Sequence, residues 1–182
     1  HRWAKLDNEE KYNEYRKEDI GYWVTRGCNN KNILSGKGKV SGSTHEIALT
    51  IKYLYNHEFV CTSIRKKTWF QFQGHRWVQV DNGWTLEEKM SEEVANYYTE
   101  YGNLYAHMAT NKVENAVEKK RLFACGDMLT SIAEKLKDIT FKEKMMKECA
   151  NKFHDPHFSK KLDSKNNLIG FENGVYELPL TI

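Results

Sequence analysis

Apolar positions recur at helical spacing in the first third of the chain. Residues 7–27 carry aromatic and aliphatic side chains at a loose helical spacing, which predicts one or two short helices. Ser43 and Glu46 form a capping-box pattern, in which the serine hydroxyl accepts from the amide three residues later. Apolar residues then follow mainly at helical spacing, so a further helix is predicted over about 44–57.

The pattern changes to short runs of strand-forming residues in the middle of the chain. Residues 59–64, 69–72 and 75–80 are rich in β-branched and aromatic side chains. A polar turn at 65–68 separates the first two runs, and Gly74 separates the last two. Three short antiparallel strands are the economical interpretation.

Two of these runs carry aromatic residues on alternate positions. Phe70 and Phe72 share one face of their strand, and His75, Trp77 and Gln79 share one face of the next strand. Trp69, Trp77 and Trp84 are predicted to form a compact core under the helices.

Helical spacing returns after residue 84. Thr85 with Glu88 forms a second capping-box pattern, and Gly102 is expected to end or kink the helix that follows. The apolar spacing of residues 103–138 predicts one long helix or two consecutive helices.

The end of the chain reads as a short helix and a hairpin. A third capping-box pattern, Thr140 with Glu143, is expected to open a helix that runs to about Phe153 and is stopped by Pro156. Strand-like runs flank an Asn-Gly turn over about 168–178. The predicted fold class is α+β and mainly helical, with helices packed around a small antiparallel sheet at about 59–80 and a C-terminal hairpin at about 168–178.

Composition places the chain among folded domains without a membrane span. Of its 182 residues, 40% are hydrophobic and 13% aromatic, which excludes disorder and is enough for one core. No apolar run approaches the roughly 20 residues of a membrane helix. The chain begins with His1 and stops at Ile182, just after a strand-like run. Both ends are therefore expected to be cuts inside a longer polypeptide.

The residues that could carry chemistry do not form a known catalytic or metal-binding pattern. The four cysteines are spaced too widely for a zinc ribbon and are expected to be reduced and partly buried. Cys149, His154 and His157 could form half of a zinc site, but no second half follows. We expect no catalytic residue, no metal and no cofactor in this chain.

Positive charge is concentrated in one block. The net charge is +3, but residues 31–67 hold seven basic and two acidic residues, whereas residues 68–110 hold two basic and six acidic ones. The basic block closes with Arg65, Lys66 and Lys67 directly before an aromatic run. Such a turn could bind backbone phosphates beside unstacked bases, or it could be a solvated turn before a core tryptophan.

The basic block also contains a segment rich in glycine and lysine. Lys37 and Lys39 lie within it, but Lys31 stands where a phosphate-binding loop needs its first glycine, and Gly38 stands where it needs serine or threonine. The segment is therefore either a contact to the DNA backbone or a flexible linker.

Two parts of the sequence together resemble a known viral family. The motifs that carry the resemblance are FVC at 59–61, WFQF at 69–72, GHRW at 74–77 and LIGFENGVYEL at 168–178. They are similar to the middle domain of the primase-helicases of poxviruses, African swine fever virus and mimivirus-like giant viruses. The resemblance implies a helicase-associated middle domain over 43–182, and residues 1–42 would form the connector after the primase part.

The resemblance also implies a function. In this family the domain lies between a primase and a superfamily 3 helicase motor, so it would be an accessory, non-catalytic piece of an ATP-dependent DNA helicase-primase. It would aid assembly of a homo-hexamer and guide single-stranded or forked DNA. ATP and magnesium would bind to the motor and not to this domain. Its setting would be the viral replication factory in the host cytoplasm, with other viral replication proteins as further partners and no membrane.

Two functions from different classes remain open at this point. In the first, the domain binds DNA, and the candidate contacts are Arg65, Lys66, Lys67, Lys37, Lys39 and Arg76. In the second, helical faces within 85–138 form a protein-interaction or oligomerisation module that does not bind DNA directly. A stand-alone enzyme would need a site that the sequence does not contain.

Overall fold

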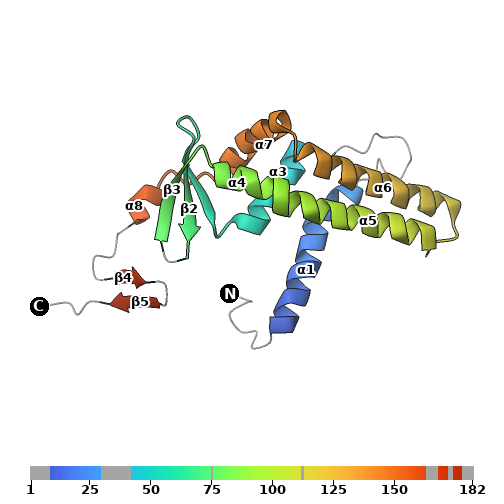
Figure 1. Cartoon of the computed structure of the whole chain (residues 1–182), viewed down its shortest axis with the longest axis horizontal. Helices are drawn as coiled ribbons and strands as arrows, with labels where there is room; N and C mark the ends of the chain where they lie inside the picture. The colour runs from blue at the N-terminus through green and yellow to red at the C-terminus, as the bar shows by residue number, and fades with distance from the viewer. Residues whose placement is uncertain are drawn as a thin grey trace, which may run out of the picture.

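A long pair of helices and a small sheet are the most prominent parts of the molecule, and further helices pack beside them (Figure 1). The computed structural model describes residues 9–29, 42–74, 76–111, 113–162, 168–171 and 174–177. Within these residues the predicted fold class is confirmed, because helices dominate and three short antiparallel strands form the one larger sheet. None of the described helices combines the length and the hydropathy that a bilayer span requires.

The N-terminal helices are close to their predicted places. Helix α1 spans Glu9–Thr25, so the stretch predicted as one or two helices forms one, followed by the short 3-10 helix η2 at Arg26–Asn29. Helix α3 spans Thr44–Tyr55, and the Ser43 hydroxyl accepts from the amide of Glu46 as the capping box predicts. The buried face of α3 includes Ile47 and Ile51 in the main core.

The next helical run begins two residues earlier than a cap at Thr85 predicts, and it has a different cap. Helix α4 spans Trp84–Lys89, and its N-cap is Gly83, not Thr85. Gly83 has φ 71°, and a Cβ there would lie 3.0 Å from the ring of Trp69 and 2.8 Å from Met146. Glycine is needed here because the backbone is left-handed and closely packed. The second capping-box prediction was therefore wrong, and Thr85 instead has a buried hydroxyl.

Helices α5 and α6 form the long antiparallel pair in Figure 1. The run continues from α4 through the π-helix η3, Met90–Val94, into α5, Ala95–Asn111, and α6 spans Ala116–Lys135. Gly102 does not end α5, which continues to Asn111. A Cβ on Gly102 would meet Thr130 Oγ1 at 2.7 Å, so the missing side chain lets the two helices approach closely.

Helix α7 spans Ile139–Lys152, close to its predicted range. Its cap is Asp138, whose carboxylate accepts from the amide of Phe141, so the third capping-box prediction, Thr140 with Glu143, was wrong. A short helix α8 follows at Phe158–Lys161, after the proline that was expected to stop α7. Asp and Thr are both favourable N-cap residues, and the sequence has Asp138 only two positions before Thr140.

The sheet has the order β1-β2-β3 and is antiparallel throughout. The strands are β1, Phe59–Ser63, β2, Thr68–Gln73, and β3, Arg76–Asp81. A segment after α7 covers the outer edge of β1: the Cys61 amide donates to the Phe153 carbonyl and the Asp155 amide to the Cys61 carbonyl, both at 3.0 Å. Covering this edge satisfies backbone groups that would otherwise be unpaired.

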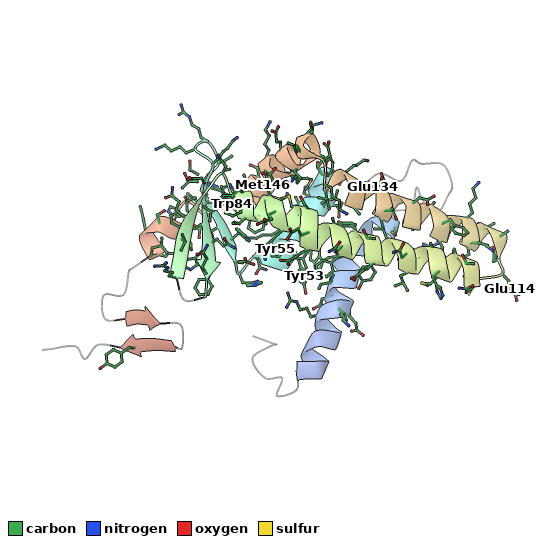
Figure 2. All side chains as sticks on the ribbon, viewed as in Figure 1. Tyr53, Tyr55, Trp84, Glu114, Glu134 and Met146 are labelled. Carbon is green, nitrogen blue, oxygen red and sulfur yellow. The ribbon has the colours of Figure 1, made fainter. Side chains whose placement is uncertain are left out.

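The two faces of the sheet have different environments. The inner face buries Phe59, Cys61 and Trp69 in the main core, where the Trp69 ring lies 5.7 Å from Phe153. The predicted cluster of three tryptophans was wrong. Trp77 lies on the opposite face of the sheet from Trp69, and Trp84 is 56% exposed at the start of α4 (Figure 2).

The remaining predictions concern the thiols and the C-terminal hairpin. The cysteines are all free and buried, which confirms reduced thiols. The hairpin is confirmed as β4, Leu168–Phe171, paired antiparallel with β5, Gly174–Glu177.

Candidate nucleic-acid interface

The basic turn between β1 and β2 is the candidate site that the sequence singled out. It projects from one end of the sheet (Figure 1). The side chains of Arg65, Lys66 and Lys67 are all exposed, and so is Ile64, at 40% of its area. The structure therefore brings three of the predicted contacts together in one solvent-facing turn.

The backbone of this turn is held by local hydrogen bonds. The Ser63 hydroxyl accepts from the amide of Lys66 at 3.2 Å, and the amide of Lys67 donates to the Ile64 carbonyl at 3.3 Å. Lys67 has φ 49°, a left-handed conformation that is uncommon for a residue with a Cβ. These contacts use backbone groups and a serine, so the three cationic groups stay directed to solvent.

The cations of the turn have no acidic partner within the described residues. No ion pair found there includes Arg65, Lys66 or Lys67. The nearest acidic position along the sheet is Asp81, an exposed residue whose backbone pairs with Thr68 at the same end. Three cations against one carboxylate leave an excess of positive charge, which favours an anionic partner.

The strands hold the turn against the core. Next to the turn, Cys61 pairs with Trp69 across β1 and β2, and both side chains are buried. The ladder is irregular between Cys61 and Ser63, as in a β-bulge. Bulges re-aim side chains at the end of a strand pair, and this one lies directly before the basic turn.

Arg76 does not belong to the same cluster. It starts β3 opposite Gln73, whereas the basic turn adjoins Thr68 at the other end of β2. Six residues of β2 separate the two ends by about 17 Å. Arg76 is exposed, so it could only contact a ligand that extends along the sheet. Lys37 and Lys39 lie outside the described residues.

The sequence did not indicate the aromatic cluster on the outer face of the sheet. Phe158 from α8 packs against Phe70, with 5.7 Å between ring centroids, and against Trp77, at 4.8 Å. Trp77 also contacts Phe72 at 5.3 Å. Alternation identified the strand residues, but nothing in the sequence shows that Phe158 returns to this face after the proline turn.

A polar network joining the sheet to the helices was also missed. Glu58 accepts from the Gln71 amide at 2.8 Å and lies 3.6 Å from Lys89, whose ammonium also contacts Glu93 at 2.8 Å. Tyr55, labelled in Figure 2, donates its hydroxyl to Glu93 at 3.0 Å. The only sequence signal was the spacing of Lys89 and Glu93, four apart on one helix. The network fixes the sheet against α3 and the α4–η3 run.

The proposed zinc half-site has no support from the arrangement of its side chains. Cys149 is fully buried and burial raises the pKa of its thiol, whereas His154 and His157 are exposed. No group of three metal-ligating side chains lies together in the part of the chain that the structure describes.

Comparisons with known proteins identify the family. A family model described as D5 N terminal like matches residues 48–179. The chain is 33% identical over 178 residues to a putative helicase of Acanthamoeba polyphaga mimivirus, a match that covers 98% of the chain and 17% of that protein. It is 24% identical over 151 residues to a putative helicase of Frog virus 3, which covers 68% of the chain and 16% of that protein.

The extent of these matches decides what they show. The family model covers well over half of the chain, and the mimivirus match covers nearly all of it. The chain spans about a sixth of the length of the two curated relatives. The resemblance found in the sheet and hairpin motifs is thereby confirmed. The chain belongs to the D5 N terminal like family, a domain found in the viral proteins named putative helicases, of the D5-like primase-helicase family.

Proposed function

We propose that this domain is a non-catalytic accessory part of a viral DNA helicase-primase and that it binds the DNA backbone through Arg65, Lys66 and Lys67. The observation that carries the proposal is the exposed basic turn, in which three cations lack an acidic partner among the described residues. Backbone phosphates are the anions that such a turn would meet in a helicase.

The placement of the turn supports guidance of DNA rather than chemistry on it. The turn stands on a sheet whose inner face is part of the main core, so its position is fixed relative to the helices. Contacts to phosphates position a nucleic acid without reading its bases. The domain would thus hold a strand in register with a motor, independently of sequence.

The catalytic steps would take place elsewhere in such a protein. ATP and magnesium would be bound by a helicase motor and nucleotides by a primase, and this domain would help the motor assemble as a hexamer in a cytoplasmic viral replication factory. These roles extend the likeness of the chain to viral relatives whose names include the word helicase.

A binding titration tests the DNA contact. Single-stranded and forked oligonucleotides are titrated against the wild type and against the variant R65E/K66E/K67E. A matched control is K120E/K135E/K137E, which lowers the net charge by the same amount. Its three lysines are exposed, two of them on α6 and the third two residues after the end of α6. The proposal predicts that only the first variant loses most of its affinity. Equal losses in the two variants would show a general charge effect and contradict the site.

A second candidate function is an oligomerisation module that does not touch DNA. The observation that favours it is the set of apolar side chains exposed on α5 and α6, where Leu104 is 47%, Val117 77% and Phe123 39% exposed. Exposed apolar side chains on one helical pair are typical of protein contacts when they form a patch.

Light scattering separates the two functions. Oligomerisation would give a mass several times that of the 21.4 kDa chain, independent of added DNA, and V117E would lower that mass. A monomer that binds DNA normally would contradict this second candidate.

A further inference from the structure

The outer face of the three-stranded sheet has features that the basic turn alone does not explain. Residues that pair across antiparallel strands lie on the same face. The register therefore places Phe72 beside Trp77 and Phe70 beside Gln79, all on the side away from the core. This face carries aromatic rings where a solvated sheet would carry polar residues.

The rings on this face are only partly covered. Phe158 of α8 covers the middle of the face and is itself 9% exposed, in contact with Phe70 and Trp77. Phe72 lies beyond Phe158 and is 38% exposed, and Trp77 is half-buried next to it. The end of the face near the β2–β3 turn is therefore an aromatic surface open to solvent.

The charge around this face is complementary to nucleic acid. Lys160 is exposed on α8, and the basic turn lies at the other end of the same sheet. Arg76 is exposed at the start of β3, but it pairs with Gln73 and therefore lies on the strand face opposite to that of Trp77, so it is not counted. The one carboxylate at an outer-face position of the three strands is Asp81, next to the basic turn. Lys161 is already paired with Asp155, so it is not counted.

We propose that this outer face is a stacking platform for unpaired bases, with Phe72 and Trp77 as the stacking side chains. This inference rests on the proposed binding of DNA. A single strand that has its phosphates on the basic turn would cross about 17 Å along β2 before its bases reach Phe72. Every base has a flat aromatic face, so such stacking tolerates any sequence.

The platform assigns separate tasks to the two ends of the sheet. The basic turn would supply affinity that salt weakens, because it acts through charge. The aromatic end would supply affinity that persists at high salt and requires bases. A duplex keeps its bases stacked inside, so the platform would favour single-stranded DNA over double-stranded DNA.

The experiment compares oligonucleotides that differ only in their bases. An oligothymidylate and an abasic strand of equal length and charge are titrated against the 182-residue chain. The expected result is about tenfold tighter binding of the oligothymidylate, which corresponds to stacking of one base. F72A should remove most of this preference, and R65E/K66E/K67E should weaken both ligands alike.

A second measurement assigns the contact to Trp77. Tryptophan fluorescence should be quenched by the oligothymidylate in the wild type and in W84F but much less in W77F. Trp84 is a suitable control because it is exposed on α4, away from the outer face. Thermal melting of F72A and W77F checks that each variant is folded, and F72L, which keeps apolar bulk without an aromatic face, should behave as F72A does.

The outcomes separate the platform from the function on which it rests. Equal binding of the two strands by the wild type would overturn the platform and leave the basic turn in place. Failure to bind either strand would overturn both. A lower mass of F72A in light scattering, with the base preference unchanged, would assign this face to a protein contact instead and also overturn the platform.

Discussion

The hydroxyl of Tyr55 on α3 donates a hydrogen bond of 3.0 Å to Oε2 of Glu93 in the π-helix η3. The same carboxylate accepts from Lys89 at 2.8 Å, and the Lys89 ammonium lies 5.1 Å from the centre of the Tyr55 ring. Tyr55 itself is buried, at 5% exposure. This group therefore connects the first core helix to the run that leads into the long helical pair.

The charge state of Glu93 should make stability depend on pH. Burial alone would raise the pKa of Glu93, but hydrogen bonds from Lys89 and Tyr55 outweigh it, and its pKa is lowered from 4.5. A lowered pKa in the folded state stabilises the fold above the unfolded pKa, and this contribution is lost as pH falls through the folded value.

The variant E93Q tests this contribution. It should be less stable than the wild type by less than about 1 kcal/mol near pH 7, because the carboxylate is partly exposed. The difference should stay constant down to about pH 4.5, the ordinary value, and shrink below it. Urea denaturation at several pH values measures it, with E92Q as the control. A difference between E93Q and wild type that grows below pH 4.5 would contradict the assignment.

The close approach of α5 and α6 gives a second prediction. A Cβ on Gly126 would lie 3.0 Å from the carbonyl oxygen of Gly102, a backbone atom that cannot move aside. We expect G126A to destabilise the domain by about 1–2 kcal/mol, although alanine is the better helix former. The control N103A introduces the same helix-forming alanine at an exposed site of α5 and should be neutral or stabilising. If G126A raises the melting temperature as N103A does, the helices do not touch here.

The position of the α7 cap can be checked by paired variants. Asp138 caps the helix through the amide of Phe141, so D138A should lower the free energy of unfolding by about 0.5–2 kcal/mol. T140A should change it little, because Thr140 is exposed and makes no capping bond. Chemical denaturation compares the two, and a larger effect of T140A would restore the cap that the sequence suggested.

The cysteines should be unreactive in the folded domain. Cys28, Cys61, Cys125 and Cys149 are each fully buried, and burial raises the pKa of the Cys61 and Cys149 thiols. A thiol reagent should therefore label the native protein slowly and all the thiols rapidly in denaturant. Rapid labelling of any cysteine under native conditions would show that its side chain reaches solvent.

The sequence predicted the elements better than their caps and contacts. Hydrophobic periodicity located the helices and the three strands, because burial of one face imposes the pattern directly. It failed where two local signals competed, as at Asp138 and Thr140, and where a glycine served packing instead of a helix end, as at Gly102. Such choices are decided by tertiary contacts, which one sequence does not display.

Only the part of the candidate site that depends on local sequence was predictable. The basic turn follows from three adjacent residues between two strand patterns, so local sequence was sufficient. The aromatic outer face depends on Phe158, which lies 81 positions after Trp77 in the sequence and meets it only in the folded chain. The separation of Arg76 from the basic turn likewise follows from the strand register and not from spacing.

The salt dependence of DNA binding tests the central claim most directly. Binding of a single strand to the wild type and to R65E/K66E/K67E is measured over a range of salt concentrations. If the three cations contact phosphates, the slope of log K against log salt should be smaller in the variant by about 2, since each contact to a single strand contributes about 0.7. Identical slopes for the two proteins would contradict a phosphate-binding basic turn.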